Sequence, residues 1–354
     1  MRYGFHILDS AVSEHYTAWL DFWRSWPERE IFAHPEFVKL FCRKGDRAIC
    51  ATWRGERGGV IFPLIKRPLE TECWAKNQSG LSDLISPYGY GGPYCWGQVN
   101  PASFWNAFDE WAIKAEIVSC FARLSLFAEQ LLPFRGTVEM NALNIVRTLN
   151  IPRDILWMRY EHKVRKNVKR AQTEGISVER DETGSRLDEF LSVYYSTMER
   201  RRANEGYLFQ REFFLAIINE LSDQYAFFYA IKQGRIVSSE LVLVSDRHLY
   251  SFLGGTLSEA FAYRPNDLIK HSIIQWGLEL GKSTFVLGGG YGGSDGIYRF
   301  KRSFAPDGER KFYVGKRIWN EQLYANITDM RRTFETQAGR AWMPKNDFFP
   351  AYRG

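Results

Sequence analysis

The stretch Leu253–Leu287, LGGTLSEAFAYRPNDLIKHSIIQWGLELGKSTFVL, decides the fold. A helix is expected to begin at Pro265, because the N–H that proline lacks would have no partner in a first helical turn. Apolar side chains then recur at steps of four, three and four residues, which is the spacing of one buried helical face. These side chains are Ile269, Ile273, Trp276 and Leu280. With a strand expected at Thr284–Leu287, the stretch predicts a glycine-bearing strand, a helix and a closing strand.

A weak copy of this block stands in the first half of the chain. Tyr90-Gly91-Gly92-Pro93 parallels the later glycine pair, Pro101 parallels Pro265, and a closing strand is expected at Ile117–Leu126. The apolar side chains after the earlier proline are Phe104, Phe108, Trp111 and Ala115. They show the same steps of four, three and four, and a repeat of this kind indicates two related units.

Both halves also begin alike, with an apolar helix followed by two strands that can pair as a hairpin. The helices are expected to open at 34–37 and 210–213, and the strand pairs at 48–55 with 60–65 and 226–234 with 236–244. This order predicts an α+β protein, with mixed sheets flanked by helices and some parallel pairing near the end of each half. The predicted domains are 1–158 and 181–354, with the proposed active site in the second, joined by a basic helix at 159–180.

The connecting segment is strongly cationic. Its basic residues are Arg159, Lys163, Arg165, Lys166, Lys169 and Arg170, and Glu174-Gly175 marks a helix end. Val164, Val168 and Ala171 give the segment a narrow apolar stripe. Two interpretations stay open: a solvated basic face, or a face that binds phosphates or RNA.

Composition favours a cytoplasmic protein that meets anionic partners. The 354 residues carry a net charge of +6, which suits nucleotide phosphates, coenzyme A, RNA or a membrane surface. The longest apolar runs, such as Leu241–Val244, fall far short of the roughly 20 residues of a membrane span. No signal-peptide pattern and no transmembrane segment is found. No metal-ligand cluster appears, so no metal is expected.

The densest glycine stretch is Leu287–Gly296. It formally contains G-x-G-x-x-G at Gly288, Gly290 and Gly293, but no βαβ unit with a later acidic residue follows, which argues against a dinucleotide site. The glycines either let backbone N–H groups approach a substrate or form a structural loop.

Three ionisable side chains are candidates for catalysis. Glu240 interrupts an otherwise apolar strand. It is either a buried carboxylate, which needs a partner or a proton, or a residue of a solvent-facing polar side that it shares with Ser238. Asp267 lies four residues before His271 on the predicted helix, where it can orient the imidazole or simply be a helix N-terminal acid. Lys301 stands between Phe300 and Arg302. A cation there can hold phosphate or stabilise negative charge on a carbonyl oxygen, or the segment is an amphipathic strand or helix with a solvated face.

The stretch Asp295–Phe304, DGIYRFKRSF, is similar to the late D-G-[IL]-Y-x-F-K-[KR]-x-F signature of FemABX-like proteins. Arg165–Ala171, followed by Glu174-Gly175, also resembles that family, and the likeness extends over nearly the whole chain. The resemblance implies two tandem GNAT-type domains and acyl transfer to an amine. Peptidoglycan members of the family take aminoacyl-tRNA as donor, whereas related tandem-GNAT proteins acylate nucleotide-linked amino sugars from acyl-CoA.

The resemblance also implies roles for individual residues. Lys301 matches the lysine that stabilises the acyl carbonyl in the peptidyltransferases. Because the attacking amine must be neutral, a base is also needed, and Glu240 and Asp267 are the candidates for it. Lys39 is the counterpart of a lysine that grips acceptor phosphates, a role that Arg200–Arg202 can also fill. The predicted substrate-binding residues are Lys39, Tyr88, Arg200, Arg201, Tyr207, Gly254, Gly255, Asn266, Gly289, Tyr291, Asp295 and Tyr298.

Two departures from the wider pattern bear on the donor. The GNAT pyrophosphate loop is missing, since Arg264–Ile269 stands in its place. The coiled-coil arm of some tRNA-dependent members is missing too. The glycine-bearing segments favour the sugar branch, so we expect an N-acyltransferase that moves an acyl group from a coenzyme A thioester, with no permanently bound cofactor, to a nucleotide-linked amino sugar in surface-polysaccharide biosynthesis. The alternatives are an aminoacyl-tRNA-dependent transferase acting on a peptidoglycan precursor, and a binding module for an anionic glycan.

Overall fold

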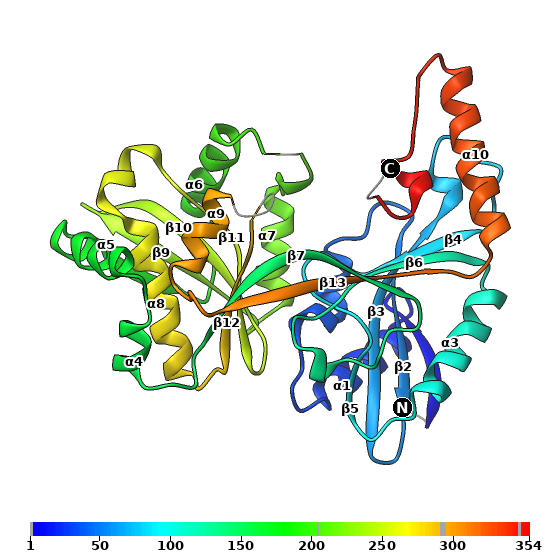
Figure 1. The fold of residues 1–354 in the computed structure, drawn as a ribbon, viewed down its shortest axis with the longest axis horizontal. Coiled ribbons are helices and arrows are strands. Elements are labelled where there is room, and N and C mark those ends of the chain that lie inside the picture. Colours follow the sequence, from blue (N-terminus) through cyan, green and yellow to red (C-terminus); the bar gives the residue numbers. More distant parts are fainter. Residues whose placement is uncertain (1–2, 204, 291–294, 346–347) are drawn as a thin grey trace. The chain divides into compact units, whose positions relative to one another are not determined.

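Each of the two units of the chain is built on mixed β-structure flanked by helices (Figure 1). The computed structural model describes residues 3–203, 205–290, 295–345 and 348–354. The α+β class with mixed sheets is confirmed, with parallel strand pairs in both units.

The units do not follow chain order. Unit 1 consists of Met1–Pro27, Phe32–Asn141 and Phe312–Gly354, and unit 2 consists of Glu28–Ile31 and Ala142–Lys311. The sequence ranges 1–158, 159–180 and 181–354 describe the duplication along the chain, and as domain boundaries they stay a prediction.

Unit 1 carries strands in the order β1-β2-β3-β4-β6-β13, with β5 paired to β3. The β4–β6 pair is parallel and its other pairs are antiparallel. The strands are β1 (Gly4–Asp9), β2 (Arg47–Arg54), β3 (Gly58–Pro68), β4 (Ser82–Ile85), β5 (Tyr94–Gly97), β6 (Ile117–Arg123) and the later part of β13 (Glu309–Ile318). The helices are α1 (Ser13–Arg24), α2 (Pro35–Lys39), α3 (Pro101–Lys114) and α10 (Glu321–Gln337).

Unit 2 carries strands in the order β7-β12-β11-β10-β9-β8. Here β11 and β12 are parallel, and the other pairs are antiparallel. The strands are the later part of β7 (Thr137–Thr148), β8 (Ser177–Asp181), β9 (Tyr225–Lys232), β10 (Arg235–Val244), β11 (His248–Thr256) and β12 (Thr284–Gly289). The helices are α4 (Arg153–Met158), α5 (His162–Thr173), α6 (Leu187–Arg200), α7 (Arg211–Glu220), α8 (Pro265–Glu279) and α9 (Gly296–Arg302).

Helices cover both faces of the sheet in unit 2, and two neighbouring phenylalanines of β9 show how. Phe227 contacts Phe190 of α6, with ring centroids 4.9 Å apart, whereas Phe228 contacts Trp276 of α8 at 5.4 Å. Successive side chains of a strand point to opposite faces. The pair α6–α7 therefore packs on one face, and α5 with α8 packs on the other.

The periodicity that predicted α8 holds for three of its four positions. Ile269, Ile273 and Trp276 are buried in the core of unit 2, but Leu280 is 47% exposed. The reason is that α8 ends at Glu279, so Leu280 lies beyond the last helical turn. In α3, Phe104 and Phe108 are buried in the same way.

The two glycine pairs are not equivalent. Gly254 and Gly255 lie in β11, whereas Tyr90–Pro93 lies outside any strand. In unit 2, β11 is parallel to β12, and the corresponding parallel pair of unit 1 is β4 with β6, so β4 takes the place of β11. Gly92 has a φ of +100°, which favours glycine, while the glycines of β11 are required by close packing.

The last residues of the chain are fixed to unit 1 by buried polar contacts. Arg353 donates from Nε to Asp83 at 2.5 Å and also pairs with Glu72. Tyr352 is fully buried, and its hydroxyl lies 2.9 Å from the hydroxyl of Ser119. The C-terminal segment is thus part of the core of unit 1.

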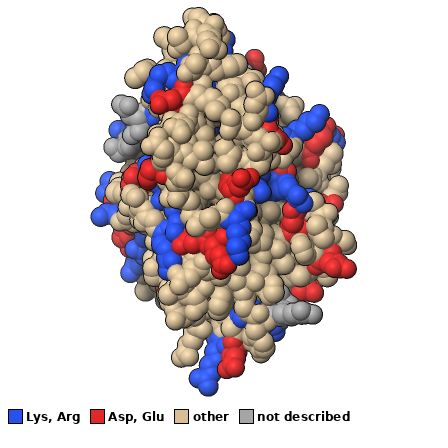
Figure 2. All heavy atoms as spheres, turned by 90° about the vertical axis from the view of Figure 1, so that its right-hand side faces the viewer, with Lys and Arg blue, Asp and Glu red and all other residues tan. Residues whose placement is uncertain are grey.

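Surface charges are mixed over the face drawn in Figure 2, where basic and acidic side chains are interspersed. Exposed ion pairs of the chain, such as Lys114 with Glu110 at 2.6 Å, are screened by water and contribute little to stability. Among the helices of the described residues, none is both long and apolar enough to span a bilayer.

Replacing Gly255 by alanine should destabilise the protein by about 1–3 kcal/mol. The added Cβ would clash with the Thr197 side chain of α6 and lie 2.9 Å from the Val193 carbonyl oxygen. Urea unfolding followed by circular dichroism measures the effect. Gly296→Ala is the matched control, because its Cβ would meet no described atom within 4 Å. Equal midpoints for the two variants would contradict the packing role of Gly255.

Candidate active site

Strands β11 and β12 separate soon after they meet. They pair only over His248–Tyr250 and Thr284–Val286. Beyond these residues β11 continues beside β10 as far as Thr256, and β12 continues beside β7 as far as Gly289. An opening therefore forms between the carboxyl ends of two parallel strands, where ligands commonly bind in sheets of this kind.

A buried ion pair lies at this opening. Lys270 of α8 donates to the carboxylate of Glu240 on β10, and its Nζ also donates to the hydroxyl of Ser251 at 2.7 Å. The Glu240 and Lys270 residues are 4% and 5% exposed. Because removing two charges from water is costly, the pair requires this close geometry and the additional hydroxyl.

Alternation along β10 explains why Glu240 faces α8. Glu240 pairs with Gly254, and its neighbour Ser239 pairs with Gly255. The Cβ position of Gly255 points at α6, so the side chain of Ser239 faces α6 and that of Glu240 faces the other way. The charge that interrupts an apolar strand in the sequence is thus directed to the face of α8.

Lys301 of α9 belongs to the same cluster. Its Nζ donates to the carbonyl oxygen of Gly289 at 2.7 Å. Burial, and then the positive charge of Lys270, lower the pKa of Lys301 to about 7, against the opposing influence of Glu240 and Asp295. Lys301 therefore exchanges its proton near neutral pH, which is typical of functional lysines. We call Glu240, Ser251, Lys270 and Lys301 the lysine–carboxylate cluster.

Two further predicted residues hold α9 in place. The carboxylate of Asp295 caps the helix by accepting the N–H of Tyr298 at 2.7 Å. The hydroxyl of Tyr298 donates to Glu309, and burial raises its pKa to about 12. Both side chains thus hold the helix that carries Lys301. Tyr291, another predicted residue, lies outside the described residues.

Asp267 and His271 have separate partners. Asp267 accepts from Nδ2 of Asn167 at 3.1 Å, and burial raises its pKa. His271 Nδ1 lies 3.3 Å from the hydroxyl of Tyr160, and burial lowers its pKa to about 4. The histidine is therefore neutral near pH 7 and is held by an aromatic partner. Asn266, the preceding residue of α8, is partly buried.

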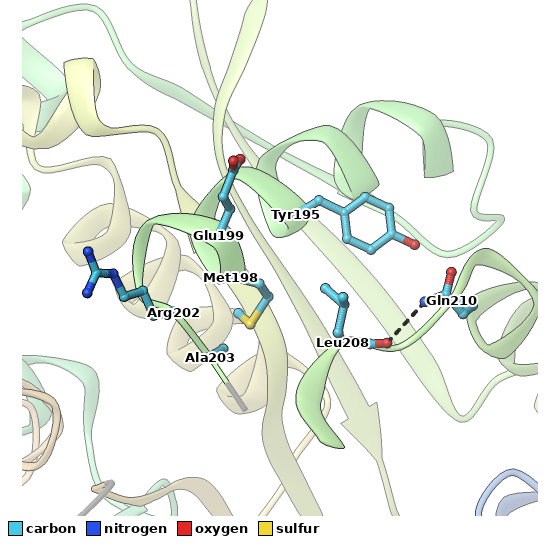
Figure 3. Close-up of a pocket in the computed structure, with 7 residues that line it drawn as sticks. All are labelled: Tyr195, Met198, Glu199, Arg202, Ala203, Leu208 and Gln210. Carbon is cyan, nitrogen blue, oxygen red and sulfur yellow. Dashed lines mark hydrogen bonds between the residues drawn. The ribbon is translucent and has the colours of Figure 1, made fainter. Parts of the chain in front are cut away.

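The residues predicted at the end of α6 lie near a separate hollow. Arg200 donates to the carbonyl oxygen of Thr256 at 2.9 Å, Arg201 is exposed at the C-cap, and the Tyr207 carbonyl accepts from Tyr194. A pocket of about 490 Å³ opens beside them (Figure 3). Its lining residues are Tyr195, Met198, Glu199, Arg202, Ala203, Leu208 and Gln210. In Figure 3 the charged ends of Glu199 and Arg202 extend away from Leu208, which leaves a largely apolar hollow.

The remaining predicted residues belong to other contacts. Lys39 lies in unit 1, where its Nζ is 2.9 Å from the carboxylate of Glu36, and Tyr88 packs near Phe41. In unit 2, the backbone of Gly254 lies against Ser239. The structure thus brings Glu240, Lys301 and the carbonyl of Gly289 together.

Lys270 and Ser251 were missed by the sequence analysis. Lys270 stands next to Ile269 on the buried side of α8, and a lysine there is as unusual as a glutamate inside an apolar strand. Matching the two buried charges of opposite sign would have identified the pair.

Comparison with known proteins supports the GNAT assignment. A family model described as an acetyltransferase (GNAT) domain matches residues 158–302. The UDP-N-acetylmuramoylpentapeptide-lysine N(6)-alanyltransferase of Weissella viridescens is 25% identical over 172 residues, which are 48% of this chain and 50% of the relative. The chain therefore matches about half the length of that curated relative.

Solved structures extend the similarity in fold to nearly the whole chain. The crystal structure of FemX has a TM-score of 0.64 at 14% identity, covering 88% of this chain and 98% of that one. The C-terminal domain of a putative lysylphosphatidylglycerol synthetase from Agrobacterium fabrum has a TM-score of 0.54 at 15% identity, covering 91% and 97%. The expected resemblance to FemABX-like tandem-GNAT proteins is confirmed, as is the acyltransferase class of the matched domain.

The preference for the amino-sugar branch was wrong. The curated relative is an alanyltransferase that acts on a muramoylpentapeptide-lysine, so the likeness favours the peptidoglycan branch over acyl-CoA transfer to a nucleotide-linked sugar. The first turn of α8 is consistent with this correction. It begins with Pro265, which has no N–H to offer a pyrophosphate, and carries the acidic Asp267.

Replacing Lys270 by methionine should lower the free energy of unfolding by about 3–5 kcal/mol, because Glu240 would be left buried without its cation. The double variant Glu240→Leu/Lys270→Met should recover most of the loss, since it removes both charges. Urea midpoints of the two variants measure the difference. A double variant as unstable as the single one would show that the pair is not the cause.

The stability contribution of Lys301 should depend on pH. Its pKa is about 7 in the folded protein and near 10.5 ordinarily, so between these values the unfolded chain binds more protons, and the free energy of unfolding rises with pH. Below about pH 7 both states are protonated, and the cost of the buried charge is constant. The urea midpoint of the wild type, relative to Lys301→Met, should therefore increase between about pH 7 and 10. Lys311→Met, at an exposed lysine, is the control variant. A difference between wild type and Lys301→Met that is flat with pH would contradict the lowered pKa of Lys301.

Proposed function

We propose that this chain transfers an aminoacyl group from aminoacyl-tRNA to an amine of a peptidoglycan precursor. The observation that carries the proposal is the 25% identity over 172 residues to an alanyltransferase of muramoylpentapeptide-lysine. The fold shared with FemX along the chain agrees with it. The family resemblance supplies the donor class, aminoacyl-tRNA, in place of acyl-CoA.

The reaction is the attack of an amine on an ester. The acceptor ammonium first loses a proton, and the neutral nitrogen then adds to the ester carbonyl. The nitrogen, now positively charged, gives up its second proton, and the oxyanion collapses to an amide as the ribose oxygen of the tRNA leaves and takes up that proton. Two groups help most in such a reaction: a base for the ammonium, and a donor aimed at the oxyanion.

Glu240 is the proposed base. Lys270 holds its Oε1 atom, while Oε2 has no hydrogen-bond partner within the described part of the chain. An acceptor amine in the opening between β11 and β12 can therefore give its proton to Oε2. Lys270 is a positioning residue, because it fixes the carboxylate and places an opposite charge beside it in a buried environment.

Lys301 is the proposed oxyanion donor. Its Nζ is held at the end of β12 by the Gly289 carbonyl oxygen, at 2.7 Å. Negative charge that develops beside Nζ favours the ammonium form of the lysine. The interaction between the ammonium group and the oxyanion is therefore strongest in the transition state. Asp267, the other candidate base, is engaged by Asn167, which leaves Glu240 as the carboxylate that we assign to the proton transfer.

Lys301→Ala should lower kcat/KM by roughly 10²- to 10³-fold, the usual loss when one oxyanion donor is removed. The assay follows transfer from a mixture of aminoacylated tRNAs to UDP-N-acetylmuramoylpentapeptide by mass spectrometry. Lys311→Ala is the control, since this lysine is exposed on β13. Full activity of Lys301→Ala would contradict the role of the lysine. Consumption of acetyl-CoA without any transfer from tRNA would contradict the proposed function.

A further inference from the structure

The basic helix α5 is not used by the reaction described above. Its apolar side chains are fixed in the core: Val164, Val168 and Ala171 are 0–1% exposed. The predicted apolar stripe is thus confirmed, and the helix lies beside α8 on one face of unit 2 (Figure 1). Asn167 connects the two helices by its hydrogen bond to Asp267.

The opposite side of α5 carries exposed cations, which we call the basic stripe: Lys163, Lys166, Lys169 and Arg170. The outer members are partly neutralised, since Lys163 lies 3.2 Å from Glu161 and Arg170 lies 3.9 Å from Glu174. Lys166 and Lys169 have no carboxylate within 4 Å among the described residues. The centre of the stripe therefore holds two cations whose charge no neighbouring acid offsets.

The stripe has the form expected of a phosphate-binding surface. With a rise of about 1.5 Å per residue, it spans about 10 Å along a rigid helix. Positions three and four residues apart lie on one side, so the cations form a line rather than a scattered set. A line of lysines can follow successive phosphates of a nucleic-acid strand, and the released counterions drive such binding.

A membrane surface is a poorer partner for α5. Helices that lie on membranes bury an apolar face among the lipids, whereas the apolar face of α5 is already occupied by the protein core. The nearby side chains Ile155 and Met158 on α4 are 43% and 65% exposed, which makes an anionic membrane the alternative to be tested.

We propose that α5 is the surface on which the phosphate backbone of the tRNA donor docks. The proposal rests on the proposed function, since that function supplies the RNA. It assigns to the basic stripe a part in binding the body of the donor, separate from the lysine–carboxylate cluster that acts on its aminoacyl end.

The test compares Lys166→Ala/Lys169→Ala with the wild type in binding deacylated tRNA, followed by fluorescence anisotropy between about 50 and 200 mM salt. The double variant should bind roughly tenfold more weakly, and the slope of log K against log salt should be shallower by about 1.5 to 2. Lys44→Ala/Lys76→Ala is the matched control, because both lysines are exposed in unit 1 and the charge change is the same. Both double variants should keep the wild-type Tm, since they alter only exposed side chains.

Three results would overturn the assignment, and they differ in what they affect. If the α5 variant binds tRNA with wild-type affinity and salt slope, the surface is wrong while the proposed function stands. If the wild type itself binds no tRNA, the proposed function fails along with it. If the α5 variant loses binding to vesicles of phosphatidylcholine and phosphatidylglycerol but keeps tRNA binding, the partner of α5 is a membrane.

Discussion

The separation of β11 from β12 is the constraint on which the candidate site depends. Each strand keeps its other neighbour, β10 or β7, so the sheet of unit 2 opens without losing its outer pairs. Along the facing edges the two strands no longer pair with each other, and the Gly289 carbonyl oxygen accepts from Lys301 instead. The opening thus places a side chain of the lysine–carboxylate cluster where a neighbouring strand would otherwise lie.

The buried pair of Glu240 and Lys270 sets the electrostatics of that opening. Each buried charge is stabilised by the other, and the two charges shift the pKa of Lys301 in opposite directions. Burial and Lys270 lower the pKa of Lys301, while Glu240 raises it. The balance leaves a lysine that changes its charge near neutrality, which an isolated surface lysine does not do.

The sequence predicted the fold better than the site. Apolar periodicity identified α8 because a buried helical face repeats regularly, and the prediction failed only at Leu280, where the helix had already ended. The glycine pairs were wrongly equated, since one serves close packing against α6 and the other lies in an irregular segment. Glu240 was recognisable as a charge within an apolar strand, but its partner Lys270 is 30 residues away in sequence, and only the fold brings them together. The substrate could not be deduced from the residues alone, because glycine-rich segments say little about what they bind.

The attachment of the C-terminal segment to unit 1 has a consequence for how the chain acquires its structure. All of the residues that form unit 2 have been synthesised once Lys311 is added, whereas unit 1 also needs Phe312–Gly354. Until then Asp83 lacks Arg353, and Ser119 lacks the hydroxyl of Tyr352. Unit 1 therefore begins to be synthesised first but is completed last. During synthesis its incomplete core exposes apolar side chains, and this is the portion of the chain on which chaperones are expected to act.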